Sequence, residues 1–347
     1  MSTETSIRDA VAKLRAGGVV GMPTETVYGL AADARRDDAV ARVFALKGRP
    51  NTNPLIVHVA TLEVAARYAV VDERARRLFA SFSPGPLTIV LPLLAPSPGT
   101  PGEGGGEGLS SSLAEAPHPN PLPAYRERGP QLTVSRLVTA GLNTVGVRIP
   151  SHPMALELLR AFDGPVAAPS ANRSNHVSPT TAAHVRVEFG VSVPVIDGGA
   201  CQVGIESTVL SLATGAPIIL RPGSITREAI ETVIGPVELF NGHVATDIAA
   251  SSPGQQAKHY APRAPAYRCD GATFSRLADD AASAKLGLLP DPAAAARNFY
   301  ASLRALDDRA PEFIVIEMPP DEPRWAALRD RITRATTPWP LAARETS

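Results

Sequence analysis

The fold of this chain is indicated first by a helix-to-strand corner, Ala45-Leu46-Lys47-Gly48-Arg49-Pro50-Asn51-Thr52-Asn53-Pro54-Leu55-Ile56-Val57-His58-Val59. The residues leading into it, Asp37 to Leu46, have apolar side chains at helical spacing and acidic residues in the first turn. Two prolines prevent the helix from continuing, and Leu55 to Val59 has the composition of a buried strand. Lys47 and Arg49 are therefore predicted at the corner.

Lys47 and Arg49 form a pair of cations separated by one glycine. A compact ammonium beside a planar guanidinium suits a triphosphate, because one supplies a point charge and the other a two-pronged donor. The following strand brings His58 to the same corner. A solvated basic corner would look the same in sequence, so this segment alone leaves both interpretations open.

The composition bounds the class of protein. A length of 347 residues accommodates two domains, and 44% hydrophobic with 20% charged residues is typical of a globular protein with a sizeable core. Basic and acidic residues number 34 each, so no net charge attracts the chain to nucleic acid or to an anionic membrane. Strong direct binding to nucleic acid is therefore not expected.

The sequence also indicates a compartment. Cys201 and Cys269 are the only cysteines and lie far apart, which fits a reducing cytoplasm and excludes a cysteine-based zinc knuckle. The apolar runs are too short to span a membrane, and the first residues lack the basic and apolar regions of a signal peptide. We expect a cytoplasmic protein that does not associate with membranes.

Short β-rich runs and a few helices extend over residues 1–237, interrupted once, and predict an α/β domain built on a twisted mixed sheet. Ser6 to Ala16 is predicted as a helix with Ser6 as its N-cap. Pro23 to Leu30 is predicted as a turn, and a capped helix start is the alternative. Strands are predicted at Val19–Met22, Leu55–Val59, Leu87–Leu94, Thr144–Ile149, Pro165–Ala168, Val193–Ile196, Glu206–Leu210 and Pro217–Arg221.

The interruption is the segment Ala95 to Pro130. Seven glycines, eight prolines and four serines make up more than half of its 36 residues. Prolines at this density exclude a helix or a central strand, and the segment has no apolar period with which to form a core. We predict a disordered insertion within one domain.

The C-terminal part has a second pattern. Residues 238–265 are rich in turn residues and are predicted as a linker or lid. Residues 266–340 alternate strands with helices, which predicts a small Rossmann-like domain with a parallel sheet. Its strands are predicted at Ala266–Cys269, Leu286–Leu289 and Phe313–Glu317, and its helices at Phe274–Ala284, Ala293–Ala305 and Arg324–Ala335.

Polar side chains gather at the predicted strand ends. No phosphate-binding loop, zinc-protease or nucleophile-elbow motif occurs in a usable context. Each polar residue taken singly is most simply a cap or a surface charge, but strand termini are where open α/β sheets bind ligands. The residues concerned are Lys47, Arg49, His58, Arg148, Ser170, Asn172, Ser207 and Arg221.

Seven ordered motifs identify a resemblance that covers nearly the whole chain outside the insertion. They are Pro23 to Leu30, Lys47 to Leu55, Pro84 to Thr88, Val147-Arg148, Pro169 to Asn172 with Ser178 to Thr180, Ser207 to Val209, and Arg221 to Gly223. In these motifs the chain resembles the YrdC/YwlC family of L-threonylcarbamoyladenylate synthases. The motif His259 to Pro262 and the C-terminal α/β segment resemble the two-domain form.

The resemblance implies a nucleotidyltransferase that converts L-threonine, bicarbonate and ATP into threonylcarbamoyl-AMP and pyrophosphate, for threonylcarbamoyladenosine modification of tRNA. It implies hand-over to a tRNA threonylcarbamoyl transferase, Mg²⁺ that arrives with ATP, and no residues dedicated to a metal. Lys47 and Arg49 would be catalytic. Threonine would be bound by Thr26, His58, Arg148, Ala168 and Ser207, and ATP by Arg49, Asn53, Thr144, Ser170, Asn172, Ser178, Arg221 and Tyr260.

Three positions depart from the family's usual pattern. Ser83 replaces a tryptophan, which removes a large buried aromatic side chain. Asn175 replaces a glycine, and asparagine is the non-glycine residue that best tolerates a positive φ. Ser211 replaces an acidic residue.

Two other functions are alternatives to the synthase. Carbamoyl-adenylate chemistry of hydrogenase maturation uses a similar domain, but it is accompanied by acylphosphatase and zinc-finger segments that this sequence lacks. An RNA-binding module without catalysis is the alternative from another class of protein. A net charge of zero and 5% aromatic residues argue against it.

Overall fold

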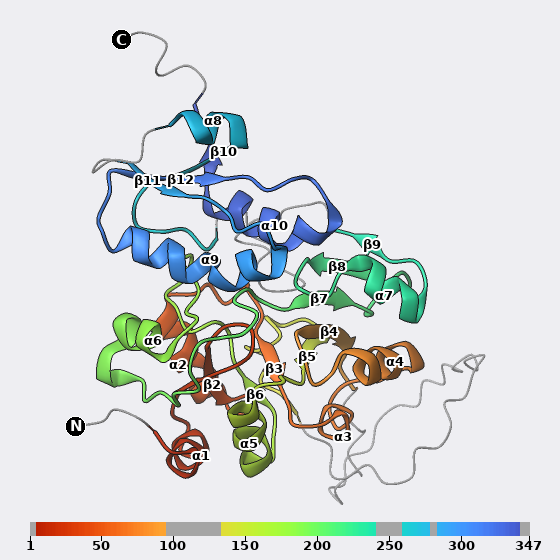
Figure 1. The fold of residues 1–347 in the computed structure, drawn as a ribbon. Helices are drawn as coiled ribbons and strands as arrows, with labels where there is room; N and C mark the ends of the chain where they lie inside the picture. Colours follow the sequence, from red (N-terminus) through yellow and green to blue (C-terminus); the bar gives the residue numbers. More distant parts are fainter. Residues whose placement is uncertain (1–4, 95–132, 241–258, 278–282, 341–347) are drawn as a thin grey trace, which may run out of the picture.

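Two β-sheets organise the structure, a computed structural model that describes residues 5–94, 133–240, 259–277 and 283–340 (Figure 1). The larger sheet has nine strands in the order β1-β2-β6-β3-β5-β4-β7-β8-β9, and the smaller has four in the order β11-β12-β10-β13. The predicted combination of a large mixed sheet and a small parallel sheet is confirmed. The predicted insertion 95–130 and most of the predicted linker lie outside the described residues.

The large sheet mixes parallel and antiparallel neighbours. Its strands are β1 Val20–Met22, β2 Gly29–Asp33, β3 Ile56–His58, β4 Leu87–Pro92, β5 Thr144–Arg148, β6 Val166–Ala167, β7 Thr208–Ser211, β8 Ile218–Arg221 and β9 Glu238–Leu239. β3 runs parallel to β5, and this register places His58 opposite Arg148. β4 runs antiparallel to β5 and places Thr88 on the other side of Arg148. The pairing therefore aligns three polar residues at one end of the sheet.

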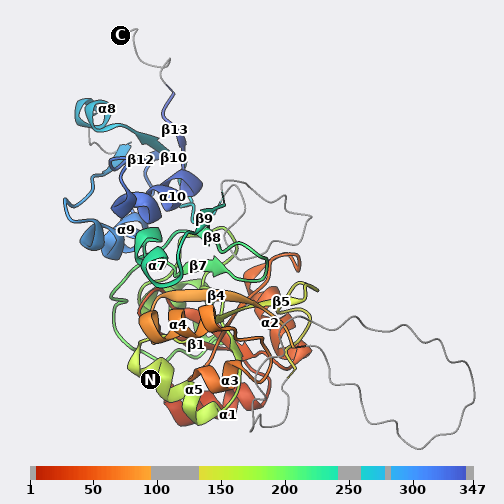
Figure 2. The same cartoon turned by 90° about the vertical axis from the view of Figure 1, so that its right-hand side faces the viewer.

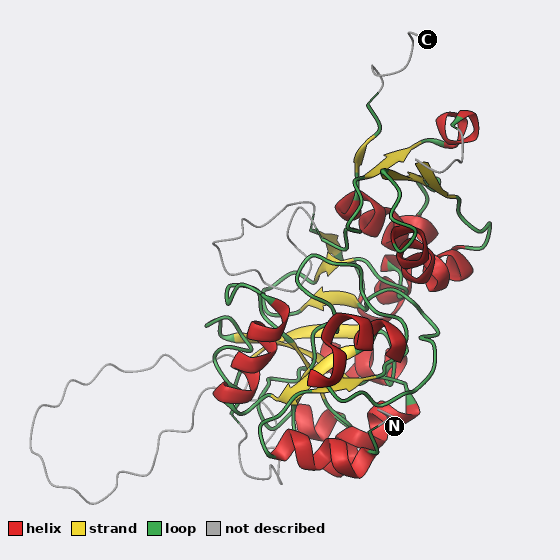
Figure 3. Ribbon diagram, turned by 90° about the vertical axis from the view of Figure 1, so that its left-hand side faces the viewer, coloured by secondary structure: helices red, strands yellow, loops and turns green. Residues whose placement is uncertain are grey.

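Helices cover both faces of this sheet (Figure 3). They are α1 Ile7–Arg15, α2 Asp37–Lys47, α3 Leu62–Ala65, α4 Glu73–Phe82, α5 Pro153–Phe162, α6 Ala182–Phe189 and α7 Arg227–Ile234, with the 3₁₀ turn η1 Gly190–Ser192. The predicted cap of α1 is confirmed, since the Ser6 side chain accepts a hydrogen bond from the Asp9 amide. α2 ends at Gly48, whose left-handed φ of 61° reverses the chain toward β3.

The small domain forms around strands β10 Ala266–Cys269, β11 Ser283–Leu286, β12 Phe313–Glu317 and β13 Thr337–Pro338. All of its strand pairs are parallel. Its helices are α8 Gly271–Arg276, α9 Pro292–Asp307 and α10 Ala326–Ala335, with the 3₁₀ turn η2 Pro323–Trp325. α9 and α10 lie on the side of the small sheet that faces the large domain (Figure 2).

The two domains share one hydrophobic cluster. Val27, Val177 and Ile205 of the large domain belong to the same buried cluster as Phe299 of α9 and Leu328 of α10. Burial of apolar surface stabilises such an interface by roughly 25 cal/mol per Å². The relative position of the domains is thus supported by packing as well as by polar contacts.

Some predicted strands were wrong or shifted where the run of strand-forming residues was short. Val193–Ile196 was predicted as an edge strand, but among the described residues only a single bridge from Val195 to Gly21 forms there. The second strand of the small domain was predicted three residues too late, at Leu286–Leu289 instead of Ser283–Leu286, and Ala284, predicted as helical, pairs with Ile314. An alanine-rich run has weak strand propensity, so its neighbour β12 decides its conformation. Pro23–Tyr28 contains no helix, and β2 follows it.

Candidate active site

A cavity that is open to solvent lies at the strand ends of the large sheet, beneath residues 259 and 260 of the linker. Its empty space, with the adjoining open solvent included, is about 540 Å³. The cavity is lined by nine of the residues that the family resemblance assigns to a site. These are Thr26, Arg49, His58, Arg148, Ala168, Ser170, Ser207, Arg221 and Tyr260. Side chains from separate strands and loops therefore meet in one place.

Five other assigned residues lie near the cavity without lining it. Lys47 is buried behind the Ser170 loop, and Thr144 lines an adjoining cavity of about 300 Å³. Ile56 lines both cavities. The remaining three residues, Asn53, Asn172 and Ser178, are all buried.

The two cations at one end of the cavity, Arg49 and Arg221, are satisfied by backbone carbonyls. Arg49 donates to the carbonyls of Asn53 and Pro54 at 3.1 and 3.0 Å, and Arg221 donates to the Ser207 carbonyl at 3.0 Å. Within the described ranges neither guanidinium forms an ion pair. A carbonyl supplies a partner but no compensating charge, so this end of the cavity keeps an excess of positive charge.

Lys47 has the same environment as these arginines. Its Nζ donates to the carbonyls of Ser170 and Asn172 at 2.6 and 2.5 Å. Burial, and then the nearby Arg49, lowers the pKa of Lys47 well below its usual value. Burial likewise lowers the pKa of Arg49 to about 10. An anion bound here would favour the charged forms of both, which is how a polyanion site is built.

The opposite end of the cavity is arranged around Arg148. Its guanidinium donates to Glu25 Oε1 at 2.6 Å and to Thr26 Oγ1 at 2.8 Å. Neighbouring His58 has an Nδ1 with no partner among the described atoms. Burial, followed by the charge of Arg148, lowers the pKa of His58 to about 3. A neutral imidazole beside an arginine can bind a hydroxyl and a carboxylate of one small molecule.

Three residues at the site were missed by sequence reasoning. Glu25 holds Arg148, Glu206 lines the cavity, and Arg331 of α10 pairs with Glu206 at 2.7 Å. Burial acts to raise the pKa of Glu206, but the charges of Arg331 and Arg221 outweigh it and lower that pKa to about 2. Glu25 falls within the motif Pro23 to Leu30 and Glu206 directly precedes the motif Ser207 to Val209, but no local pattern indicates Arg331.

Residues 259 and 260 of the linker form part of the cavity wall. Tyr260 is 1% exposed, and Arg331 lies 5.4 Å from the centre of its ring. The linker backbone is anchored on both sides, because Ala261 donates to the Asn175 carbonyl at 2.8 Å and His259 donates to the Arg334 carbonyl at 3.1 Å. Asn175 has a φ of 67°, as its replacement of a glycine predicted.

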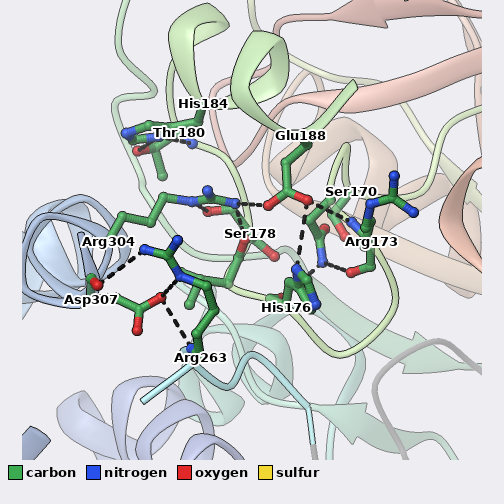
Figure 4. Close-up of polar contacts among 12 residues, drawn as sticks. Ser170, Arg173, His176, Ser178, Thr180, His184, Glu188, Arg263, Arg304 and Asp307 are labelled. Carbon is green, nitrogen blue, oxygen red and sulfur yellow. Dashed lines mark hydrogen bonds and ion pairs between the residues drawn. The ribbon is translucent and has the colours of Figure 1, made fainter. Parts of the chain in front are cut away.

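Ion pairs beside the cavity connect the Ser170 loop to α9 (Figure 4). Arg304 of α9 contacts Glu188 at 2.9 Å, and the Glu188 carboxylate lies 3.7 Å from the His176 imidazole. Arg263 of the linker pairs with Asp307 at 2.8 Å. The loop that carries the assigned residues Ser170 and Ser178 is therefore braced from the small domain.

None of the helices in the described segments is both long and apolar enough to cross a membrane.

Two protein families match consecutive parts of the chain. A family described as "Telomere recombination" (Sua5, YciO and YrdC) matches residues 12–104 and 107–223. A family described as "Threonylcarbamoyl-AMP synthase, C-terminal domain" matches residues 225–337. Together they account for most of the sequence.

Individual relatives agree with these families. Threonylcarbamoyl-AMP synthase of Bacillus subtilis is 36% identical, over 96% of this chain and 94% of the relative. That of Pyrococcus abyssi is 40% identical, over 75% of this chain and 67% of the relative. The crystal structure of P. abyssi Sua5 complexed with L-threonine is 32% identical and covers 95% of each chain, with a TM-score of 0.78. The chain therefore belongs to the threonylcarbamoyl-AMP synthase family, in its two-domain form.

Proposed function

We propose that this chain converts L-threonine, bicarbonate and ATP into threonylcarbamoyl-AMP and pyrophosphate. One observation supports this most strongly: a single cavity joins a cationic end, with Arg49 and Arg221, to an end with Arg148 and neutral His58. The first suits a triphosphate and the second a hydroxy amino acid. The names of the relatives support the same reaction.

The Arg148 end is the proposed threonine site. Arg148 would clamp the carboxylate, and the backbone of Ala168 would contact the amino acid. The side chains of Thr26, His58 and Ser207 would contact threonine's hydroxyl. A site whose polar groups need that hydroxyl discriminates against valine, because valine would leave them unpaired.

The cationic end is the proposed ATP site. Lys47 and Arg49 would stabilise charge that develops on the phosphates and are the proposed catalytic residues. The nucleotide would be held by Arg49, Asn53, Thr144, Ser170, Asn172, Ser178, Arg221 and Tyr260. Mg²⁺ would enter as part of the Mg–ATP substrate, since the cavity carboxylate Glu206 is already bonded to Ser178, Tyr300 and Arg331.

The reaction follows from these positions. The threonine amine takes up the carbon of bicarbonate and water is lost, which gives a carbamate. A carbamate oxygen then forms a bond to the α-phosphorus while the bond to pyrophosphate breaks. No covalent enzyme intermediate is required, so catalysis consists of positioning and charge stabilisation.

The proposal also covers the domain boundaries, the transfer of the product and the cellular location. Residues 1–237 would form the catalytic domain, 238–265 the linker or lid, and 266–340 the small domain. The product would pass to a tRNA threonylcarbamoyl transferase. A cytoplasmic location is supported by Cys201 and Cys269, which are buried free thiols.

Pyrophosphate release tests the function. The full chain is assayed with ATP, threonine and bicarbonate, and then with threonine or bicarbonate omitted or with valine in place of threonine. We expect release only with the complete set. Binding of RNA without threonine-dependent release would favour the RNA-binding alternative.

A further inference from the structure

A buried ion network links the small domain to the cavity. Arg331 of α10 is 0% exposed, and its Nε donates to Glu206 Oε2 at 2.7 Å. The other carboxylate oxygen of Glu206 accepts the Ser178 hydroxyl at 2.6 Å. Tyr300 of α9 donates to Oε2 at 3.0 Å. Glu206 is therefore held between an assigned nucleotide residue and the small domain.

The position of Glu206 poses an electrostatic problem for ATP. Of the described residues that line the cavity, Glu206 is the acidic one, and it shares the cavity with Arg49 and Arg221. An ionised carboxylate repels a triphosphate, and the repulsion is strong where water is excluded. Arg331 compensates the charge from the side away from the cavity. Asp330 and Arg334 extend the network, with Asp330 2.6 Å from Arg331 and 2.9 Å from Arg334.

We propose that Arg331 is a positioning residue for the nucleotide, which neutralises Glu206 and fixes its carboxylate so that the Ser178 hydroxyl is held in place. The small domain then completes the nucleotide half of the cavity without touching the substrate. This inference rests on the proposed function of the site.

A purely mechanical role would make a different prediction. Other contacts also join the domains, such as Arg297, which donates to the Gln202 carbonyl at 2.7 Å. If Arg331 were only such a tether, the sign of the charge at residue 206 would not matter. If Arg331 acts by compensating Glu206, removing the carboxylate charge must suppress the loss of Arg331.

The test compares Arg331→Met with the double variant Arg331→Met/Glu206→Gln in the full chain. We expect the single variant to raise KM for ATP about tenfold or more, because it leaves a buried carboxylate without its partner. KM for threonine should change by less than about threefold. In the double variant, glutamine keeps the shape of residue 206 without its charge, and KM for ATP should return to within about threefold of the wild type.

Two controls complete the experiment. Arg297→Ala, which removes an exposed interdomain contact, should leave both KM values unchanged. Thermal melting and binding of a non-hydrolysable ATP analogue are measured for every variant, so that the result does not depend on turnover. If Arg331→Met does not fold, a double variant that folds and binds the analogue like the wild type supports compensation.

The outcomes separate the two hypotheses. Absence of threonine-dependent pyrophosphate release by the wild-type chain would contradict the proposed function, while binding of the analogue still reports on Arg331. A double variant that binds ATP as weakly as the single variant, or a single variant that binds it normally, would overturn the role of Arg331. An equal rise in both KM values would do the same.

Discussion

The cavity of the large domain and the interface between the domains both bury arginines, but they satisfy them differently. In the cavity, Arg49 and Arg221 donate to backbone carbonyls and have no ion-pair partner in the described segments. At the interface, Arg304 and Arg331 pair with Glu188 and Glu206. Burial lowers the pKa of Arg49, whereas the acidic groups around Arg331 overcome burial and raise its pKa.

The difference distinguishes charged groups that can bind a ligand from charged groups that hold the structure together. A buried cation without a counter-ion is costly to the protein, and a bound anion removes that cost. A buried ion pair is already compensated, so it contributes geometry and little attraction for a ligand. Excess charge therefore marks the proposed ATP end of the cavity, and compensated charge marks the domain interface beside it.

The most severe test removes a cation from the cavity. Arg49→Ala or Lys47→Ala should lower kcat on the order of 10² or more, as loss of other electrostatic donors does. Each substitution leaves two backbone carbonyls without a donor but no orphaned carboxylate, so the melting temperature should fall only modestly while activity falls steeply. Pyrophosphate release and thermal melting are measured together. The control, Arg42→Ala on the exposed side of α2, should retain activity, and wild-type turnover in both cavity variants would refute their role.

Arg148 allows a second test of the comparison, because it lines the cavity and yet has an ion-pair partner. Glu25→Gln removes that pair, and Glu25 Oε2 also accepts the Ser151 amide at 3.1 Å. We expect KM for threonine to rise about tenfold while KM for ATP stays nearly constant, since a misplaced guanidinium loses its bidentate geometry. Initial rates at varied threonine and varied ATP distinguish the two. A rise in KM for ATP alone would place threonine elsewhere.

The linker residue Tyr260 lies between the cations of the cavity and Arg331 of the domain interface. Tyr260→Ala should lower the ratio of intact threonylcarbamoyl-AMP to AMP by about fivefold with little change in ATP affinity, because a lid chiefly excludes water from a labile anhydride. Chromatography of the products measures the ratio. Tyr260→Phe keeps the ring and should behave like the wild type. An unchanged ratio in the alanine variant would show that the linker is only a spacer.

Acid should affect the cavity through its neutral histidines. Burial, followed by nearby arginines, lowers the pKa of both His58 and His259 to about 3, below the unfolded value near 6.5. The unfolded chain then binds more protons, so stability is complete above pH 6.5 and is lost as pH falls toward 3. Each histidine should cost about 1 kcal/mol per pH unit in that window. Urea unfolding at pH 7.5 and 5.5 measures this, and His58→Asn should flatten the slope.

The smallest effect is expected from removing the predicted insertion. Deleting Ala95 to Pro130 and joining Leu94 to Gln131 should shift the free energy of unfolding by less than about 1 kcal/mol, because loop-closure entropy depends only logarithmically on length. Pyrophosphate release should persist. A melting temperature lowered by many degrees would identify the segment as structural.

Sequence patterns were most successful where structure is local. The strands Ala266–Cys269 and Phe313–Glu317 match β10 and β12, and the corner at Gly48 follows its predicted course. The register that sets His58 beside Arg148 joins residues 90 positions apart and has no local signal. The role of each cavity residue was inferred from the family's motifs. Residue spacing alone was equally consistent with Lys47 and Arg49 forming a solvated basic corner. Glu206 and Arg331 could not be paired from sequence, since no periodicity spans their separation.

The distance between those two residues along the chain has a consequence for biosynthesis. Arg331 follows Glu206 by 125 positions. At roughly 5 to 20 residues per second, Arg331 is added to the chain about 6 to 25 s after Glu206, and α10 emerges from the ribosome later still. Throughout that interval the nascent large domain has no cation from α10 to compensate its cavity carboxylate. If Arg331 compensates Glu206 as proposed, tight binding of ATP therefore begins only after α10 has docked.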